Sequence, residues 1–279
     1  MFDGSAAAVS ETVPDGVDPR VPHIPRILDY LLDGSANFAA DRQVAEFAFA
    51  EWPGEPGGVE GAKVDVKAAR GALGRIVRHL AADCGIQQFL DIAPGVPTMD
   101  NTHLAARSVT PSAKTVYVDL DPVVVAYGQH LLAEEGNRDV TIVQGDFNDP
   151  QDVIAQASKT LDFNQPIGLI LFGMLHFIAD REHGARMLAA YLDAMPSGSY
   201  VAVSHFALDE QDAGMNVALH AMDEKFGEAV VRRTRAEVAW FFEGMELLEP
   251  GVVGTHEWRP TDTSGSKPLP MWVAVARKR

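Results

Sequence analysis

The stretch QFLDIAPGVPT, residues 88–98, reads as an apolar strand that ends in an acidic residue and runs into a tight Pro/Gly turn. A helical pattern follows from about Asn101. In an open α/β sheet, the crevice beyond the carboxyl end of such a strand is where a nucleotide-like ligand binds. A second apolar strand, TVYVDLDP over residues 115–122, places another acidic strand end at Asp119. Together the two strand ends predict a site for an adenosine-containing cofactor.

Regular alternation of strands and helices extends outward from this stretch. Strands are expected near residues 87–92, 115–119, 139–143, 167–172 and 199–205. Helices are expected near residues 101–108, 122–135, 150–158 and 182–195. Asp121 and Pro122 supply an N-cap followed by proline at the first helical position. Alternating elements with apolar strands predict a parallel, doubly wound sheet.

The C-terminal third departs from this alternation. Helices are expected near residues 209–226 and 234–243, and strands at residues 245–248 and 271–276. We expect the last two strands to form an antiparallel hairpin. The predicted fold class is therefore α/β: a Rossmann-like, doubly wound, mostly parallel seven-stranded sheet with a C-terminal antiparallel hairpin, the layout of a class I methyltransferase.

The N-terminal part is expected to be helical and separate from the sheet. Residues 1–22 are rich in Gly, Ala, Pro and Asp without periodicity, which predicts a flexible tail. Residues 23–62 are expected to form a helical lid segment, with two short helices, a stop at Gly34 and a loop over residues 51–62. Residues 63–279 would then form the sheet domain, beginning with a helix that ends at Gly85 and turns Arg70 outward.

Composition restricts the class of protein. The formal net charge of -16 disfavours nucleic acid and anionic membranes as partners. Cys84 is the single cysteine of the chain, which excludes an intramolecular disulfide and a multi-cysteine metal site. No apolar run approaches the ~20 residues of a membrane span. We therefore expect a soluble, cytoplasmic protein.

Six stretches of the sequence resemble stretches of one known family and follow one another in the same order. These stretches are IPRILDYLLDGSANFAADR (24–42), GIQQFLDIAPGVPTMDNTH (85–103), VYVDLDPVVVA (116–126), LHFIAD (175–180), PSGSYVAVSH (196–205) and FFEGMELLEPGVV (241–253). With them, the sequence is similar to the S-adenosylmethionine (SAM) dependent methyltransferases that were formerly catalogued as a domain of unknown function and occur mainly in actinobacteria. The six stretches are spread over nearly the whole chain, and the resemblance implies SAM as the cofactor.

The resemblance implies cofactor contacts at the first turn. Asp91 is expected to accept a hydrogen bond from the ammonium group of SAM, directly or through water. Similar proteins show DIGTG here, so Ala93 and Gly95 are expected to lie against the methionine part, where glycine lets the backbone pass closely. The Ala93 methyl group and the missing N–H of Pro94 leave open how tightly SAM binds. Asp91 also fits a capping carboxylate and Gly95 an ordinary turn glycine.

The next two strand ends are expected to hold the ribose and the adenine. A carboxylate at Asp119, with Leu120 beside it, would accept both ribose hydroxyls, while Asp121 is expected to cap the following helix. After the third strand, Asp146 would accept from the adenine amine, and Phe147 would line the face of the ring. A solvated loop acid beside a core aromatic fits the same two residues equally well.

The fourth strand runs into FGMLHF, residues 172–177, which is expected to place Gly173 and Met174 near the sulfonium group. Methyl transfer demands proximity and orientation, with a base only if the acceptor must lose a proton. His176 is the first candidate for this base and His205 the second, although a lone histidine is more often structural. No cluster has convincing metal-ligand spacing, so no metal is expected.

Four residues of the N-terminal segment are candidates for the lid and the acceptor pocket: Arg26, Tyr30, Asn37 and Phe38. A helical appendage of this kind can fold over the mouth of a cofactor site and exclude water. The alternative is that Tyr30 and Phe38 only dock the segment on the core.

We therefore expect an enzyme that transfers a methyl group from SAM to a small-molecule acceptor at O, N or C, as a monomer or homodimer. A catalytically silent SAM-binding module with a regulatory or partner role is the alternative from another class. A nicotinamide-dependent oxidoreductase is a third interpretation, opposed by the missing Gly-x-Gly-x-x-Gly motif and by the terminal hairpin.

Overall fold

The computed structural model describes residues 13, 17–53, 55–96, 101–136, 139–208, 220, 230–260 and 271–279. The helix predicted near residues 209–226 lies outside this set, apart from His220. None of the helices in the described ranges is long and apolar enough to cross a membrane.

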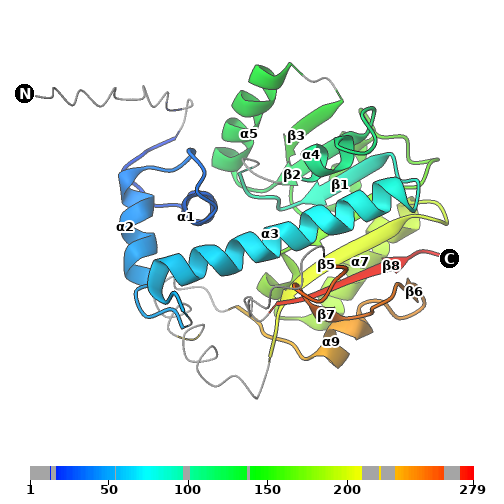
Figure 1. The fold of residues 1–279 in the computed structure, drawn as a ribbon. Helices are drawn as coiled ribbons and strands as arrows, with labels where there is room; N and C mark the ends of the chain where they lie inside the picture. The colour runs from blue at the N-terminus through cyan, green and yellow to red at the C-terminus, as the bar shows by residue number, and fades with distance from the viewer. Residues whose placement is uncertain are drawn as a thin grey trace, which may run out of the picture.

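A single sheet forms the centre of the molecule (Figure 1). Its strands are β1 (Gln88–Ile92), β2 (Lys114–Asp119), β3 (Val140–Gln144), β4 (Gly168–Phe172), β5 (Tyr200–Phe206), β6 (Glu246–Leu247), β7 (Val253–Gly254) and β8 (Met271–Arg277). The order is β3-β2-β1-β4-β5-β8-β6, and β7 also pairs with β8. The first five strands pair in parallel, whereas β8 is antiparallel to β5, β6 and β7. The predicted fold class is confirmed, with one short strand, β7, more than expected.

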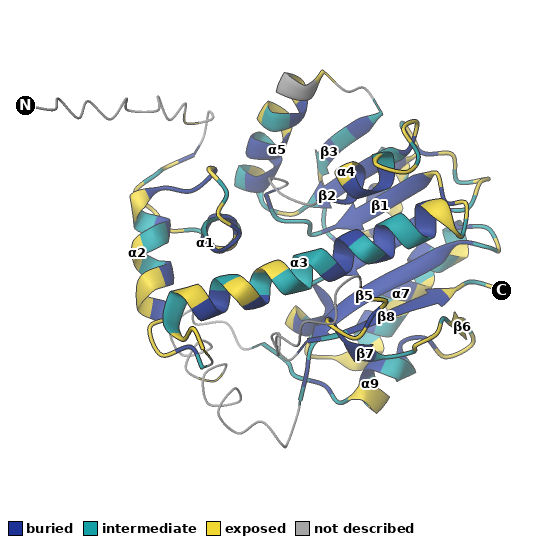
Figure 2. Cartoon of the chain, viewed as in Figure 1, coloured by how far each residue is buried: buried dark blue, intermediate teal, exposed yellow. Residues whose placement is uncertain are grey.

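Helices cover both faces of the sheet. One face carries α3 (Gly58–Ala82), α4 (Thr102–Arg107) and α5 (Pro122–Glu135), and Figure 1 shows α3 running across it. The other face carries α6 (Pro150–Ala157), α7 (Arg181–Ala194) and α9 (Arg235–Trp240). The strands between these layers are almost wholly buried, as the dark blue in Figure 2 shows. Removing this apolar surface from water is the main force that holds the layers together.

Local sequence signals set the bounds of α5. The carboxylate of Asp121 accepts a hydrogen bond from the N–H of Val123 at 2.8 Å, and Pro122 occupies the first helical position. Gly136 ends the helix in the left-handed conformation with φ 66°. Capping satisfies backbone groups that the helix cannot pair internally, so these residues fix where it starts and stops. The predicted helix over residues 122–135 and the capping role of Asp121 are confirmed.

The N-terminal segment contains α1 (Ile24–Leu31) and α2 (Ala39–Ala48). Its apolar side chains pack with those of α3 and with Met271 at the start of β8. The predicted stop at Gly34 is wrong in its mechanism, because the left-handed residue after α1 is Asp33, with φ 56°. Glycine is required at position 34 because the Asp29 side chain packs against its backbone. A Cβ atom there would lie 2.0 Å from Oδ1 of Asp29.

The predicted loop over residues 51–62 is wrong in its second half. Helix α3 begins at Gly58 and is 25 residues long, so it crosses the predicted boundary between the lid segment and the sheet domain. Gly61 lies inside the helix, where a Cβ atom would be 2.4 Å from the carbonyl oxygen of Pro56. The missing side chain at Gly61 allows the preceding loop to pack closely on the helix. This tertiary requirement for glycine resembles a loop signal in the sequence.

Candidate functional site

A cavity of about 530 Å³ opens at the carboxyl ends of the parallel strands. The turn after β1 lines it from Ala93 to Val96, and the turn after β2 lines it from Asp119 to Asp121. Phe172 and Gly173 line it at the end of β4, and α1 closes one side. A crevice at this edge of an open α/β sheet is the expected place for a ligand, and its volume suits a small molecule.

The turn after β1 has an unusual backbone. Ala93 has φ 57° and Gly95 has φ 68°, so both residues adopt the left-handed conformation. The N–H of Ala93 donates to the carbonyl of Val118 at 2.8 Å, which ties the turn to β2. An alanine in this region costs about 1–2 kcal/mol relative to glycine. The space around Gly95 is open, so the Ala-Pro-Gly turn leaves the cavity accessible to a cofactor.

Asp119 connects the two turns at one end of the cavity. Its carboxylate accepts hydrogen bonds from the backbone N–H groups of Gly95 and Asp121, the latter at 3.0 Å. Burial raises the pKa of this carboxyl group, and the two N–H donors oppose that effect. Leu120 lies next to it with an exposed side chain. The carboxylate and the open turn are together suited to hold a hydroxylated, adenosine-like group.

Asp91 lies behind the turn and does not line the cavity. Its carboxyl group is buried and accepts a hydrogen bond of 2.6 Å from the hydroxyl of Thr102 at the start of α4. Burial raises the pKa of Asp91 to about 7, although the Thr102 hydroxyl and the nearby Arg70 act in the opposite direction. Asp91 thus connects β1 with α4.

Three further predicted cofactor residues also lie outside the cavity lining. Asp146 accepts hydrogen bonds from the backbone and side chain of Asn148, at 2.8 and 2.9 Å. Phe147 is buried and stacks on Tyr191, with ring centroids 5.3 Å apart. Met174 is buried in the same apolar core. Gly173, with φ 81°, is a predicted cofactor residue that does line the cavity, together with Phe172, His176 and Phe177 of the same motif.

His176 lies in the short 3-10 helix η1 (Leu175–Phe177) and lines the cavity. Its ring packs against those of Phe177 and Phe206, at centroid distances of 4.5 and 4.6 Å, and its Nδ1 atom is buried without a hydrogen-bond partner. Burial lowers the pKa of His176 well below its usual value, and His205 and Arg233 add to this effect. The imidazole is therefore neutral at neutral pH.

His205 faces the opposite side of β5 from the cavity, because side chains alternate along a strand and the neighbouring Ser204 and Phe206 line it. Arg233 donates a hydrogen bond of 2.6 Å to its Nε2 atom, and its Nδ1–H donates to the carbonyl of Phe206 at 2.9 Å. Burial lowers the pKa of His205 to about 4. Both ring nitrogens are thus occupied, and the side chain is 5.9 Å from His176 between ring centroids.

Arg233 is buried and was not singled out in the sequence. Besides His205, its guanidinium donates to the carbonyls of Leu175, Ile178 and Ala179 at 3.2, 2.8 and 3.3 Å. It therefore fixes β5 against η1, which carries His176. No local sequence motif could predict the role of Arg233, since its hydrogen-bond acceptors come from distant parts of the chain.

Arg70 and Ser204 are two further residues that the sequence interpretation missed. Arg70 lines the cavity, so its predicted outward orientation is wrong. Ser204 also lines it, is fully buried, and has a hydroxyl oxygen without a hydrogen-bond partner. The two-residue period of a β-strand could have identified Ser204. This period places Ser204 on the same face of β5 as Phe206.

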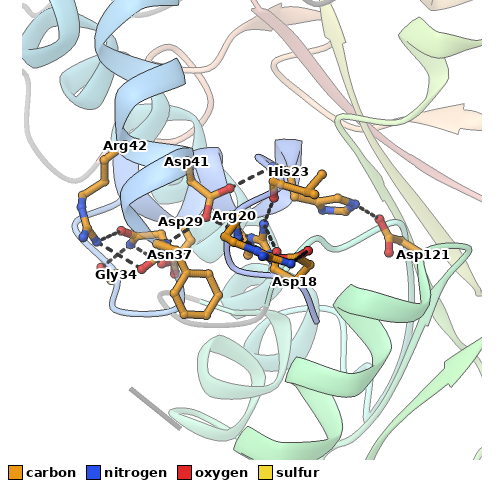
Figure 3. A network of polar contacts seen from close by, with 12 residues as sticks. Asp18, Arg20, His23, Asp29, Gly34, Asn37, Asp41, Arg42 and Asp121 are labelled. Atoms are coloured by element: carbon orange, nitrogen blue, oxygen red, sulfur yellow. Dashed lines mark hydrogen bonds and ion pairs between the residues drawn. The ribbon is translucent and has the colours of Figure 1, made fainter. Parts of the chain in front are cut away.

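The four predicted lid residues fix the N-terminal segment and do not line the cavity. Buried Arg26 pairs with Asp41 at 3.0 Å, and Asp41 also accepts the N–H groups of His23 and Phe38, each at 2.8 Å (Figure 3). Asn37 donates to Oδ2 of Asp29 at 2.8 Å.

Tyr30 donates to Glu46 at 2.7 Å, and the ring of Phe38 lies 6.4 Å from that of Tyr127. The side of α1 that does border the cavity is mostly apolar, with Ile24, Ile27 and Leu28, and its one acidic residue there is Asp29. Among the residues that the structure describes, no group of three or more His, Cys, Asp or Glu side chains could hold a metal ion.

Comparisons with known proteins identify the family to which the chain belongs. A family model described as S-adenosyl methyltransferase matches residues 10–279. A candidate methyltransferase from Thermobifida fusca YX is 35% identical, with 97% of this chain and 100% of that chain covered and a TM-score of 0.84. A DUF574 family protein from Streptomyces avermitilis is 34% identical, with 94% and 99% covered and a TM-score of 0.82.

More distant structures share the fold alone. Magnesium protoporphyrin IX methyltransferase from Synechocystis PCC 6803, crystallised with bound S-adenosylhomocysteine (SAH), is 12% identical over 78% of this chain and 87% of that chain, with a TM-score of 0.53. Among curated proteins, none matches this sequence. The family match confirms the resemblance seen in the sequence: the chain belongs to the S-adenosyl methyltransferase family, and SAM is its cofactor.

Proposed function

We propose that this chain is an enzyme that transfers a methyl group from SAM to a small molecule bound in the same cavity. The observation that carries the proposal is the arrangement of the cavity, with Asp119 and the Ala93–Gly95 turn at one end and His176 at another strand end. Fixed placement of two reactants in one cavity supplies most of what methyl transfer needs. The acidic composition and the single Cys84 support a cytoplasmic location.

At the cofactor end, Asp119 would hold the ribose hydroxyls, and the Ala93–Gly95 turn would pass along the methionine part. Arg70 is the one Lys or Arg side chain that lines the cavity within the described residues, which makes it the candidate partner for the carboxylate of SAM. Asp91 would act from behind, by holding α4 and the turn through Thr102. Apolar residues of α1 would cover the bound molecules, so the N-terminal helical segment would still act as a lid.

At the acceptor end, SAM supplies the methyl group, and the protein must orient the acceptor and receive its proton. His176 is the candidate base, because the neutral imidazole lines the cavity and has a lone pair available. His205 and Arg233 would act as positioning residues, since Arg233 fixes η1 against β5.

The first experiment is calorimetry of SAM and SAH binding to the wild type, Asp119→Asn and Asp149→Asn. Asp149 is a matched control, since it caps α6 outside the cavity and asparagine is also a good N-cap. We expect micromolar binding by the wild type and the control, and at least about a tenfold loss in Asp119→Asn, the value of one good hydrogen bond to a charged group. No binding by a folded wild type would refute the proposal. SAH binding without methyl transfer to any acceptor would favour the catalytically silent SAM-binding module.

A further inference from the structure

An exposed apolar rim surrounds the cavity. Ile24, Leu28, Leu120 and Phe177 all line it, yet 37%, 38%, 62% and 50% of their surfaces are exposed. Large apolar side chains that gather at the mouth of a cavity mark a surface that a ligand covers. Leu120 adjoins Asp119 at the cofactor end, which leaves Ile24, Leu28 and Phe177 for the second ligand.

The inner wall of the same cavity is aromatic and apolar. Phe49, Phe172, Phe206 and Met271 line it from four separate parts of the chain. Phe206 also packs against His176, at 4.6 Å between ring centroids. Walls of this kind favour a flat, apolar ring over a flexible polar chain, because ring faces and edges pack well against one another.

Two polar side chains, those of Ser204 and His176, interrupt this apolar wall. The hydroxyl oxygen of Ser204 and the Nδ1 atom of His176 are both buried and lack hydrogen-bond partners, and both residues line the cavity. Ser199, on the strand-entry side of β5, differs, since its hydroxyl oxygen accepts the N–H of Ile167 at 3.1 Å. Buried polar groups are normally paired, so two unpaired ones at a cavity point to a ligand group that pairs them. A hydroxyl fits because it both donates and accepts.

The charges around the cavity disfavour the binding of an anionic acceptor. Asp29, Asp119 and Asp121 line it, whereas Arg70 is its single Lys or Arg within the described part of the chain. If Arg70 pairs with the carboxylate of SAM, the described cavity lining offers an acceptor carboxylate no Lys or Arg side chain to pair with it. The net charge of -16 repels anions at longer range as well.

We propose that the acceptor is an uncharged, apolar ring compound whose hydroxyl group lies against Ser204 and His176. The inference rests on the proposed function and narrows its acceptor from O, N or C to a ring hydroxyl. The α1 side chains Ile24 and Leu28 cover the ring, and Phe172 and Phe206 form its inner contact.

The test uses three probes with one ring system: 2-naphthol, naphthalene and 2-naphthoate. Each is titrated by fluorescence into full-length protein saturated with SAH, and SAH binding itself is measured first by calorimetry. We expect 2-naphthol to bind at least about tenfold more tightly than either other probe, the usual effect of one satisfied polar group. In Ser204→Ala, the advantage of 2-naphthol over naphthalene should fall to less than about threefold while SAH affinity stays unchanged.

Ser199→Ala is the matched control. It removes a hydroxyl that pairs inside the protein, so we expect a lower melting temperature and an unchanged preference for 2-naphthol. Ser204→Ala should not lower the melting temperature, because its hydroxyl has no partner to lose. Equal binding of 2-naphthol and naphthalene, tighter binding of 2-naphthoate, or no probe binding to SAH-loaded protein would each overturn the inference. Failure of SAH itself to bind would instead refute the proposed function.

Discussion

The Nε2 atom of His23 lies 2.6 Å from the Oδ2 atom of Asp121 (Figure 3). His23 precedes α1, and Asp121 caps α5, so this contact joins the N-terminal helical segment to the sheet domain. The N–H of Asp121 in turn donates to Asp119. A continuous series of polar contacts therefore leads from α1 to the carboxylate that we assign to the cofactor.

His23→Ala should weaken SAH binding by roughly threefold to tenfold, because one hydrogen bond that positions the Asp119–Asp121 turn is lost. The protein should remain folded, since both side chains are partly exposed. Calorimetry with circular dichroism measures both effects. His183→Ala is the control, because its contact with Asn148 lies outside the cavity. An SAH affinity equal to that of the wild type would show that the contact does not support the turn.

Ala93→Gly should stabilise the protein by about 1 kcal/mol, since glycine adopts φ 57° without the steric cost that alanine pays. For a domain of this size, this corresponds to a rise in melting temperature of roughly 2–4 °C. The control is Ala189→Gly on the exposed side of α7, where the same substitution should destabilise by about 1 kcal/mol. A loss of stability in Ala93→Gly would contradict the strain argument.

Arg233→Met should lower the free energy of unfolding by about 3 kcal/mol, because several buried carbonyls and the Nε2 atom of His205 lose their donor. Burial is the main cause of the low pKa of His205, and Arg233 adds to it, so the pKa should rise above about 4 in the variant. Urea denaturation and NMR titration measure the two effects. The exposed Arg186→Met is the control and should change stability by less than about 0.5 kcal/mol.

Asp91→Asn should change the pH dependence of stability. The unfolded carboxyl group loses its proton near pH 4, whereas the folded one keeps it until about pH 7, so rising pH favours the unfolded wild type across this window. The free energy of unfolding of the wild type should fall by up to about 1.4 kcal/mol per pH unit relative to Asp91→Asn. Urea denaturation at several pH values between 4 and 8 tests this. Parallel curves for the two proteins would exclude a raised pKa at Asp91.

The sequence predicted the elements that depend on local chemistry. Asp121, Pro122 and Gly136 bound α5 by capping, which acts within a few residues and is therefore visible in the sequence. Gly34 was wrongly interpreted as a helix stop and Gly61 as part of a loop. Their lack of a side chain instead accommodates Asp29 and Pro56 in tertiary packing. A sequence shows that a residue is glycine, but not whether the backbone or a neighbour requires it.

The candidate site was predictable where strand ends define it. Ala93, Gly95, Asp119, Leu120, Gly173 and His176 all reach the cavity, because the carboxyl ends of parallel strands meet at one edge. Phe147 stacks on Tyr191 instead, and Arg233 reaches His205 from a distant segment. These contacts join residues that are far apart in the chain, so no spacing rule could identify them.

Strand β8, residues Met271–Arg277, is the last strand of the sequence yet lies inside the sheet, between β5 and β6. On the ribosome, a nascent chain that has reached Trp240 therefore presents β5 as an unpaired edge, which is a template for association with other chains. The parallel half can form during synthesis, but the antiparallel half must wait for β8. Truncation or slow synthesis near residue 270 should thus cause aggregation through the unpaired edge of β5. The turns that we assign to the cofactor would still be present in such a chain.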